Sequence, residues 1–439
     1  MAKKKGEEAL IEATAAAMDR AQTYNPLLVA LKENDKKNLF KTNVTTAFLK
    51  TGFPLFDYYF GSVINIHDEM GKLVAQEARV GQAAGTFNLI VGNSGAGKTT
   101  LGAQIAANII RQYRYANVIH FDCENRFDVS RCETITRLPS SFFDADQGER
   151  YMIRTGLVGL DIIQEMIVKT YVNKMKLKKE LTVPSGFKDE FGREVMIFEP
   201  TVILIDSITT VLNETFNPDS QKEASEAEKM RGNTEGARDA KTLKGFFKDI
   251  IPLCKEANII IYGINHINQN MSMNSFIPVA KQQNFLKQDE IIPGGKTMIY
   301  YPFNIIKLTA RPSDDFTEES DGFSGYMVMI EPIKSSSNQS GNNSKGISFE
   351  MVFMQKYGFD SLRSLIIYGR EQGLIEGNKS RMKFKGDDSF TFSFKNIDQE
   401  KYDKPIWESV KKFIIPTLNK HLSFIEPDVK VFDNRSLDY

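Results

Sequence analysis

The sequence predicts an α/β protein with a mainly parallel, twisted sheet and a small C-terminal α+β domain. Two observations support this: continuous apolar segments typical of buried strands, and segments of helical periodicity between them. The apolar segments are FNLIV (87–91), NVIHFD (117–122), TVILID (201–206) and NIIIYGI (258–264), and the helical segments are 98–113, 160–175 and 238–257. Strands that are apolar on both faces and joined through helices are typical of parallel sheets covered on both sides.

The C-terminal part of the predicted sheet has a different pattern. Three further strands are expected near 303–309, 325–333 and 347–354, with no helix between them. Because antiparallel strands need no helical crossover, we expect this edge of the sheet to be antiparallel. The charged segment 176–200 is expected to form a hairpin insertion, and HDEMGKLVAQEARVGQAAG (67–85) an insertion on the surface.

Length and composition divide the chain into three regions. Its 439 residues are enough for two or three domains. We expect an N-terminal helix and linker region at 1–86 with a short helix at 7–20, a core at 87–357 and a small domain at 358–439. The last region is aromatic and rich in lysine, and its final helix, from Pro405, carries the only tryptophan.

Charge and cysteine content restrict the possible partners. The chain has 56 Lys and Arg residues and 56 Asp and Glu residues, so any nucleic-acid binding must come from a local patch. The three cysteines are widely spaced, which argues against a zinc site or a disulfide framework and favours a reducing, cytoplasmic location. No apolar run approaches the ~20 residues of a membrane helix, so no membrane partner is expected.

The segment GNSGAGKT, residues 92–99, satisfies the nucleotide-binding pattern GxxxxGK[ST]. A predicted strand precedes it and a predicted helix follows, as the mechanism requires, because glycines let backbone N–H groups surround phosphates at a helix N-terminus. Lys98 is expected to reach the β- and γ-phosphates of ATP, and the Thr99 hydroxyl to bind Mg²⁺. The residues predicted to contact the nucleotide here are Gly92, Asn93, Ser94, Gly95, Ala96, Gly97, Lys98, Thr99 and Thr100.

Two carboxylates follow neighbouring predicted strands. Asp206 ends an apolar strand and is expected to hold the metal, directly or through water. Glu124 closes another strand and is the candidate general base that activates water, with a helix cap or an ion pair as the alternative. Asp122 is assigned to the opposite face by strand alternation and is less favoured.

The ordered set of motifs resembles the RecA recombinases, and among them the phage UvsX-like branch. The resemblance runs from about residue 51 to 424 and is carried by TGFPLFDYYFG, HFDCENRFD, VILIDSITTV, YGINHI, PGGKTMIYYPFNIIKLTAR, VMIEPIKSS and GREQGLIEGNKSRMKFKG. It implies a RecA-type P-loop ATPase core that forms helical filaments on single-stranded DNA, with subunits joined partly through region 1–86. It also implies DNA-dependent ATP hydrolysis and strand exchange with homologous duplex DNA, assisted by single-strand-binding and loader or mediator proteins, in the cytoplasm of a host cell.

The resemblance further implies two DNA-binding loops. One is the long segment 268–293, with Phe276 as a wedge between DNA triplets and Lys281 and Lys287 near phosphates, closed by Gly294 and Gly295. The other is 217–239, with Arg231 and Arg238 on DNA. Solvated lysines and arginines, and a buried Phe276, are the alternatives.

Three more roles follow from the resemblance. His266 would sense the γ-phosphate and relay its presence to the long segment, and Arg131 would stack on the adenine. Lys334 would reach the ATP of a neighbouring subunit, while Ser336 replaces the second cation of the family pair and Lys345 is its candidate substitute.

Two other functions share these features. A RecA-fold replicative helicase would form a hexameric ring, and an assembly or signalling ATPase without a DNA role would use the long segment for protein contacts.

Overall fold

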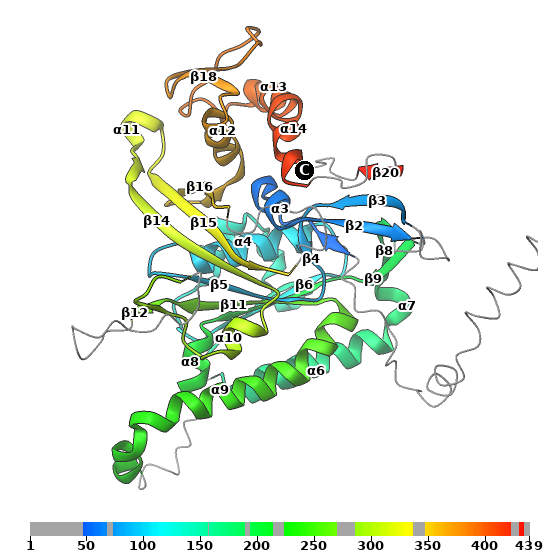
Figure 1. Ribbon diagram of the computed structural model, residues 1–439, viewed down its shortest axis with the longest axis vertical. Coiled ribbons are helices and arrows are strands. Elements are labelled where there is room, and N and C mark those ends of the chain that lie inside the picture. Colours follow the sequence, from blue (N-terminus) through cyan, green and yellow to red (C-terminus); the bar gives the residue numbers. More distant parts are fainter. Residues whose placement is uncertain are drawn as a thin grey trace, which may run out of the picture. The chain divides into compact units, whose positions relative to one another are not determined.

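The computed structural model describes residues 47–67, 73–156, 158–188, 194–213, 224–269, 286–336, 347–422 and 430–433 (Figure 1). The predicted helix at 7–20 and the predicted roles of Phe276, Lys281 and Lys345 lie outside the described residues. No helix in the described ranges combines the length and the apolar character that crossing a bilayer requires.

A nine-stranded mixed sheet forms the centre of the fold. In spatial order its strands are β17 (Gly358–Asp360), β16 (Phe349–Met354), β15 (Gly325–Ser335), β14 (Asn304–Phe316), β5 (Phe87–Gly92), β11 (Ile259–His266), β10 (Thr201–Asp206), β6 (Asn117–Asp122) and β7 (Tyr151–Thr155). The strands from β14 to β7 are parallel, whereas β15, β16 and β17 pair in antiparallel fashion. The predicted α/β class and the antiparallel edge are confirmed.

Helices cover both faces of the parallel part. Ile90 and Leu204 belong to the core cluster that includes the apolar side of α4 (Lys98–Arg111). Leu89 and Ile203, one residue earlier in each strand, belong to the cluster that includes α6 (Leu160–Lys176) and α9 (Ala224–Ala257). Figure 1 shows α6 and α9 side by side below the sheet. The apolar strands are therefore continuous because alternate side chains are buried on opposite faces.

Helix α9 is longer than the predicted helix at 238–257. It begins at Ala224, so the expectation of a loop at 217–239 is wrong from residue 224 onward. The segment ASEAEKMRGNTEGARD is rich in Ala, Glu, Lys, Met and Arg, which favour helix, and its two glycines do not end the helix. Arg231 and Arg238 lie within α9.

Two of the smaller sheets contain segments that the sequence predicts to be insertions. The predicted hairpin insertion is confirmed as β8 (Thr182–Lys188) and β9 (Glu194–Phe198). The segment predicted to be a surface insertion instead contributes β3 (Leu73–Arg79) to a sheet with β2 (Ser62–His67) and β20 (Lys430–Asp433). Two of its charged residues misled the prediction: Glu77 and Arg79 are buried as a pair, and Arg79 Nε donates to Glu77 Oε2 at 3.0 Å.

The C-terminal elements include a helix with a buried arginine, Arg363. They are α12 (Ser361–Glu371), β18 (Ile375–Asn378), β19 (Arg381–Phe384), α13 (Glu400–Ser409) and α14 (Ile415–Leu418), with a π-helical turn at Val410–Ile414. The Arg363 guanidinium donates to Asp360 at 3.0 Å and to Asp398 at 2.6 Å. It also lies 4.7 Å from the centre of the Phe323 ring, so one side chain joins α12 to three other segments.

The shorter elements connect these parts. They are β1 (Phe48–Leu49), α3 (Pro54–Phe60), β4 (Gln82–Ala83), α5 (Val129–Thr136), α7 (Lys178–Leu181), α8 (Ile208–Asn213), β12 (Asn268–Gln269), β13 (Glu290–Ile291), α10 (Thr297–Tyr300) and α11 (Glu318–Asp321), with 3-10 turns at Ser140–Phe142, Ala145–Gln147 and Asn419–His421.

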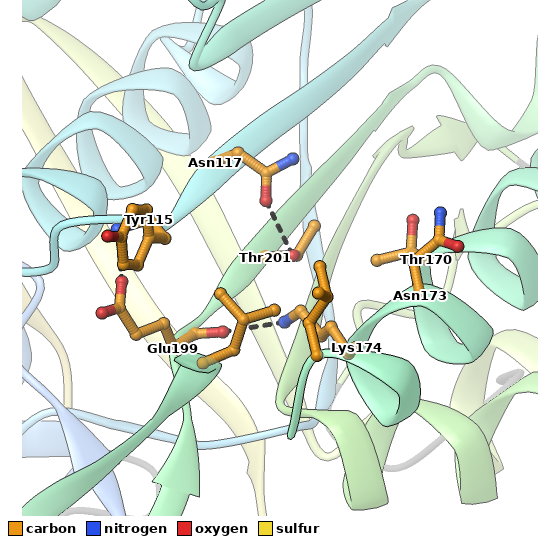
Figure 2. A pocket seen from close by; sticks show the side chains of 9 residues that line it. Tyr115, Asn117, Thr170, Asn173, Lys174, Glu199 and Thr201 are labelled. Carbon is orange, nitrogen blue, oxygen red and sulfur yellow. Dashed lines mark hydrogen bonds between the residues drawn. The ribbon is translucent and has the colours of Figure 1, made fainter. Parts of the chain in front are cut away.

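A small cavity of about 260 Å³ lies where β6 and β10 begin (Figure 2). Lys174 of α6 lines it, and its Nζ donates to the carbonyl oxygens of Glu199 (2.8 Å) and Ala257 (2.9 Å). Burial lowers the pKa of Lys174 to about 7. The ammonium group therefore ties α6 to the end of α9 and to the connection between β9 and β10, at the sheet edge opposite the carboxyl ends of the strands.

Candidate functional site

The loop between β5 and α4, residues 92–97 and called the glycine-rich loop below, requires glycine at two positions. Gly95 and Gly97 have φ angles of 77° and 84°, which other residues seldom adopt. A Cβ atom on Gly97 would also lie 2.9 Å from the Phe353 ring. The loop leads into the first turn of α4, where backbone N–H groups and the helix dipole favour an anion. The local geometry is therefore suited to phosphate.

A cavity of about 420 Å³ opens at the carboxyl ends of the parallel strands, beside the glycine-rich loop. Ten of the predicted site residues line it: Ser94, Gly95, Gly97, Lys98, Thr99, Thr100, Glu124, Arg131, Asp206 and His266. The other lining residues are Asp122, Arg126, Phe127, Tyr326 and Phe353. The parallel register explains the convergence, because Asp122, Asp206, His266 and Gly92 each end one of four adjacent strands.

Thr99 and Asp206 are in direct contact inside the cavity. The Thr99 hydroxyl donates to Asp206 Oδ2 at 2.5 Å, and Asp206 is only 7% exposed. Burial raises the pKa of Asp206 to about 6, and the nearby Glu124 and Asp122 add to the shift, while the Thr99 hydroxyl and Lys98 oppose it. Lys98 Nζ donates to the Asn93 carbonyl at 2.8 Å. Burial lowers the pKa of Lys98, although Asp206 and Glu124 counteract this.

The oxygen atoms of Thr99 and Asp206 fit Mg²⁺. Among the described residues, no group of three or more His, Cys, Asp or Glu side chains is placed to hold a metal by itself. A cation here would therefore need water and phosphate oxygens as its other ligands, which is the coordination Mg²⁺ prefers. The raised pKa of Asp206 shows a buried carboxylate that an added positive charge would stabilise.

Replacing Asp206 with asparagine is expected to remove a pH-dependent loss of stability. The folded-state pKa of about 6 lies above the ordinary 3.8, so the parent loses stability as the pH rises from about 4 to about 6. Asparagine does not titrate there. The free energy of unfolding of the variant minus that of the parent should therefore be up to about 3 kcal/mol larger at about pH 8 than below pH 4. Urea unfolding of both proteins without Mg²⁺, across this range, measures the difference. Parallel stability profiles would contradict the expectation.

Glu124 is held by two partners, one at each carboxylate oxygen. His266 Nε2 lies 3.3 Å from Oε1, and Arg126 Nη1 lies 3.3 Å from Oε2. Asp122 was predicted to face away, and this is wrong, because Asp122 lines the same cavity. Its Oδ2 atom accepts a hydrogen bond from the Phe127 N–H at 2.8 Å, which shapes the turn that follows β6.

Arg131 is held at the rim of the cavity by backbone carbonyls. Its guanidinium donates to the carbonyls of Lys356 (2.9 Å) and Gln355 (3.3 Å). These bonds lie along the edge of the guanidinium and leave its faces available for stacking.

Lys334 does not line the cavity of its own chain. Its Nζ donates to the carbonyls of Ile299 (3.0 Å), Tyr300 (2.8 Å) and Pro302 (2.6 Å), around the end of α10. Burial lowers the pKa of Lys334. The Ser336 N–H, two residues later, donates to the Phe303 carbonyl.

The base of the long segment is connected to the cavity. The Asn265 side chain accepts a hydrogen bond from the His266 N–H at 2.8 Å and donates to the Pro293 carbonyl at 3.1 Å. The antiparallel strands β12 and β13 join the two ends of the segment. Glu290 of β13 accepts from the Lys287 N–H (3.0 Å) and from Lys307 Nζ (2.9 Å). Lys287 itself is exposed.

Gly294 and Gly295 follow the segment with positive φ angles of 91° and 68°, which glycine adopts without strain. They form the turn that leads from β13 into α10.

Sequence reasoning missed Tyr326 and Phe353. The Tyr326 hydroxyl donates to the Gly95 carbonyl at 2.6 Å, and its ring stacks on Phe353 with centroids 5.0 Å apart. Tyr326 thus holds the tip of the glycine-rich loop from 231 residues away in the chain. No local pattern could have indicated this contact. Arg126 was detectable as a basic residue two positions after Glu124.

The cavity therefore combines a glycine-rich loop, a lysine, a hydroxyl beside a buried carboxylate, and a second carboxylate that can accept a proton. No protein-family model matches this chain, and no curated protein matches it.

Proposed function

We propose that this chain is an ATP-dependent recombinase with a RecA-type ATPase core, which forms filaments on single-stranded DNA and exchanges strands with homologous duplex DNA. One observation supports this most directly. The Thr99–Asp206 pair and the Glu124–His266 pair line one cavity, and His266 lies two residues before the long segment. A site of this kind can hydrolyse a nucleoside triphosphate and report its state to the segment.

The residues divide the chemistry of hydrolysis among them. Backbone N–H groups of the glycine-rich loop and Lys98 bind and orient the phosphates. Thr99 and Asp206 would hold Mg²⁺, and the ion would supply positive charge beside the phosphates. Glu124 accepts a proton from water while the water oxygen bonds to the γ-phosphorus. The bond from that phosphorus to the β–γ bridging oxygen breaks.

His266 is placed to couple this chemistry to DNA. It contacts Glu124 through its side chain and Asn265 through its backbone, and Asn265 holds the Pro293 carbonyl at the far end of the long segment. A change in the position of the His266 ring would reach both ends of segment 268–293. In the proposal, this segment and α9 contact DNA through Phe276, Lys281, Lys287, Arg231 and Arg238.

The subunit contact is also part of the proposal. Lys334 would approach the nucleotide of a neighbouring subunit, and to do so it must exchange its three carbonyl partners for phosphate oxygens. ATP hydrolysis should then rise with protein concentration as filaments assemble.

Replacing Arg231 or Arg238 with alanine is expected to weaken binding of single-stranded DNA of any sequence. Each lost phosphate contact should reduce the slope of log Kd against log salt concentration by about 0.7. Fluorescence anisotropy with labelled oligonucleotides measures both effects, and Lys244→Ala, an exposed lysine of the same helix, is the matched control. Unchanged affinity and slope for both variants would remove these arginines from the DNA site.

ATP hydrolysis with and without single-stranded DNA, together with electron microscopy, tests the whole proposal. Stimulated hydrolysis and helical filaments support a recombinase. Closed rings would indicate a helicase. A rate of hydrolysis that single-stranded DNA does not change would indicate an assembly or signalling ATPase.

A further inference from the structure

Arg126 lines the cavity beside the candidate general base, on the turn that follows β6. Its Nη1 atom lies 3.3 Å from Glu124 Oε2, and 78% of its side chain is exposed. An ion pair as exposed as this contributes little stability. Arg126 is therefore held only weakly by Glu124 and can exchange this carboxylate for a more strongly charged anion.

Such an exchange would open one side of the Glu124 carboxylate to the attacking water. One of its oxygens faces His266 and the other faces Arg126, both at 3.3 Å. A general base must offer an oxygen to the attacking water. His266 ends the buried strand β11, and its backbone N–H donates to the Asn265 side chain, so its backbone position is fixed by the sheet. Its side chain is 37% exposed, whereas that of Arg126 is 78% exposed, so Arg126 is the partner that leaves more readily.

The other cations that line the cavity have different partners. Lys98 Nζ donates to the Asn93 carbonyl, and Arg131 donates to the carbonyls of Gln355 and Lys356. Among the described lysines and arginines of the cavity, only Arg126 forms an ion pair with a carboxylate within 4 Å. A triphosphate bound beside Arg126 would carry several negative charges, and these would compete with the single charge of Glu124 for the guanidinium.

We infer that Arg126 is a catalytic residue that passes from Glu124 to the γ-phosphoryl oxygens of a bound nucleoside triphosphate. The inference rests on the proposed ATPase function. The move frees Glu124 Oε2 to take the proton of the attacking water. Water oxygen then bonds to the γ-phosphorus, the diphosphate leaves with the bridging oxygen and its electron pair, and Arg126 stabilises the charge on the transferred group. Arg126, from the same chain as the bound nucleotide, would then supply the positive charge that is missing because Ser336 replaces the second cation of the family pair.

The test compares Arg126→Gln and Arg126→Lys with Arg154→Gln. Arg154 is a matched control, because it also forms an exposed 3.3 Å ion pair with a glutamate, outside the cavity. We expect Arg126→Gln to bind ATP within about threefold of the parent but to hydrolyse it about 10²-fold more slowly in single-turnover assays. Arg126→Lys should be intermediate, and Arg154→Gln should match the parent. In Arg126→Ala, guanidinium ion at a concentration far below denaturing should restore part of the rate.

Three outcomes overturn the inference. Parental hydrolysis by Arg126→Gln would show that the guanidinium takes no part. A loss confined to ATP affinity would make Arg126 a binding residue only. If the parent itself hydrolyses no ATP, the proposed function fails and the inference fails with it, so the two failures are distinguishable.

Discussion

Replacing Glu124 with glutamine is expected to lower the rate of ATP hydrolysis by about 10²- to 10⁴-fold while ATP and DNA binding stay near parental values. Glutamine keeps the shape of the side chain and an oxygen that can face His266, but it cannot take a proton from water at neutral pH. Filaments formed with ATP should persist because hydrolysis no longer ends the ATP-bound state. Single-turnover hydrolysis and equilibrium binding, measured on the same preparations, separate the two effects.

Glu149→Gln is the matched control for this variant. The Glu149 carboxylate has the same exposed fraction as that of Glu124, 20%, and also pairs with an arginine at 3.3 Å, but it does not line the cavity. It should hydrolyse ATP at the parental rate. If Glu124→Gln does so as well, Glu124 is not the base.

Replacing Lys98 with methionine is expected to raise the Kd for ATP by about 10- to 150-fold. Hydrogen bonds to charged groups contribute about 1.5–3 kcal/mol, and Lys98 directly follows the glycine-rich loop, which itself contains no lysine or arginine. Methionine retains most of the apolar contact of the buried lysine stem. Isothermal titration calorimetry measures the affinity, and thermal unfolding without nucleotide checks that the fold is intact.

Lys174→Met controls for the loss of a buried lysine. Lys174 is 6% exposed and Lys98 is 7% exposed, and both donate to backbone carbonyls. Only Lys98 lines the cavity beside the glycine-rich loop. The control is expected to change stability and leave ATP affinity unaltered. Equal affinity losses in the two variants would mean that Lys98 acts through the fold.

Strand order at the antiparallel edge was predictable because it depends on local spacing. The connection from β14 to β15, residues 317–324, is shorter than the dozen or more residues of a parallel crossover, and the only helix in it, which the sequence did not predict, is the four-residue α11. The start of α9 at Ala224 was not predicted, because the resemblance suggested a loop where the residues themselves favour helix. The burial of β3 was missed for another reason: Glu77 and Arg79 look solvated in sequence, yet they neutralise each other inside the fold.

In the site, too, residues that belong to short motifs were predicted, whereas residues brought in from distant parts of the chain were not. Lys98 and Thr99 follow from one motif, and Asp206 from the strand that precedes it. Asp122 was assigned to the wrong face, although residues two apart along a strand share a face and Glu124 follows only two positions later. Tyr326 and Phe353 reach the glycine-rich loop only through the register of β15 and β16, which no short segment encodes.

The position of β5 between β11 and β14 determines when the cavity can exist during synthesis. On the ribosome, β5 and the glycine-rich loop emerge early, but both hydrogen-bonded neighbours of β5 belong to residues 259–316. The aromatic rings that meet Gly97 come later still, from Phe353 and Phe359. A nascent chain therefore carries β5 with two open edges until most of the protein has been made. The cavity beside the glycine-rich loop is thus completed only after Phe359 has been made, and until then the open apolar edges of β5 are exposed to aggregation.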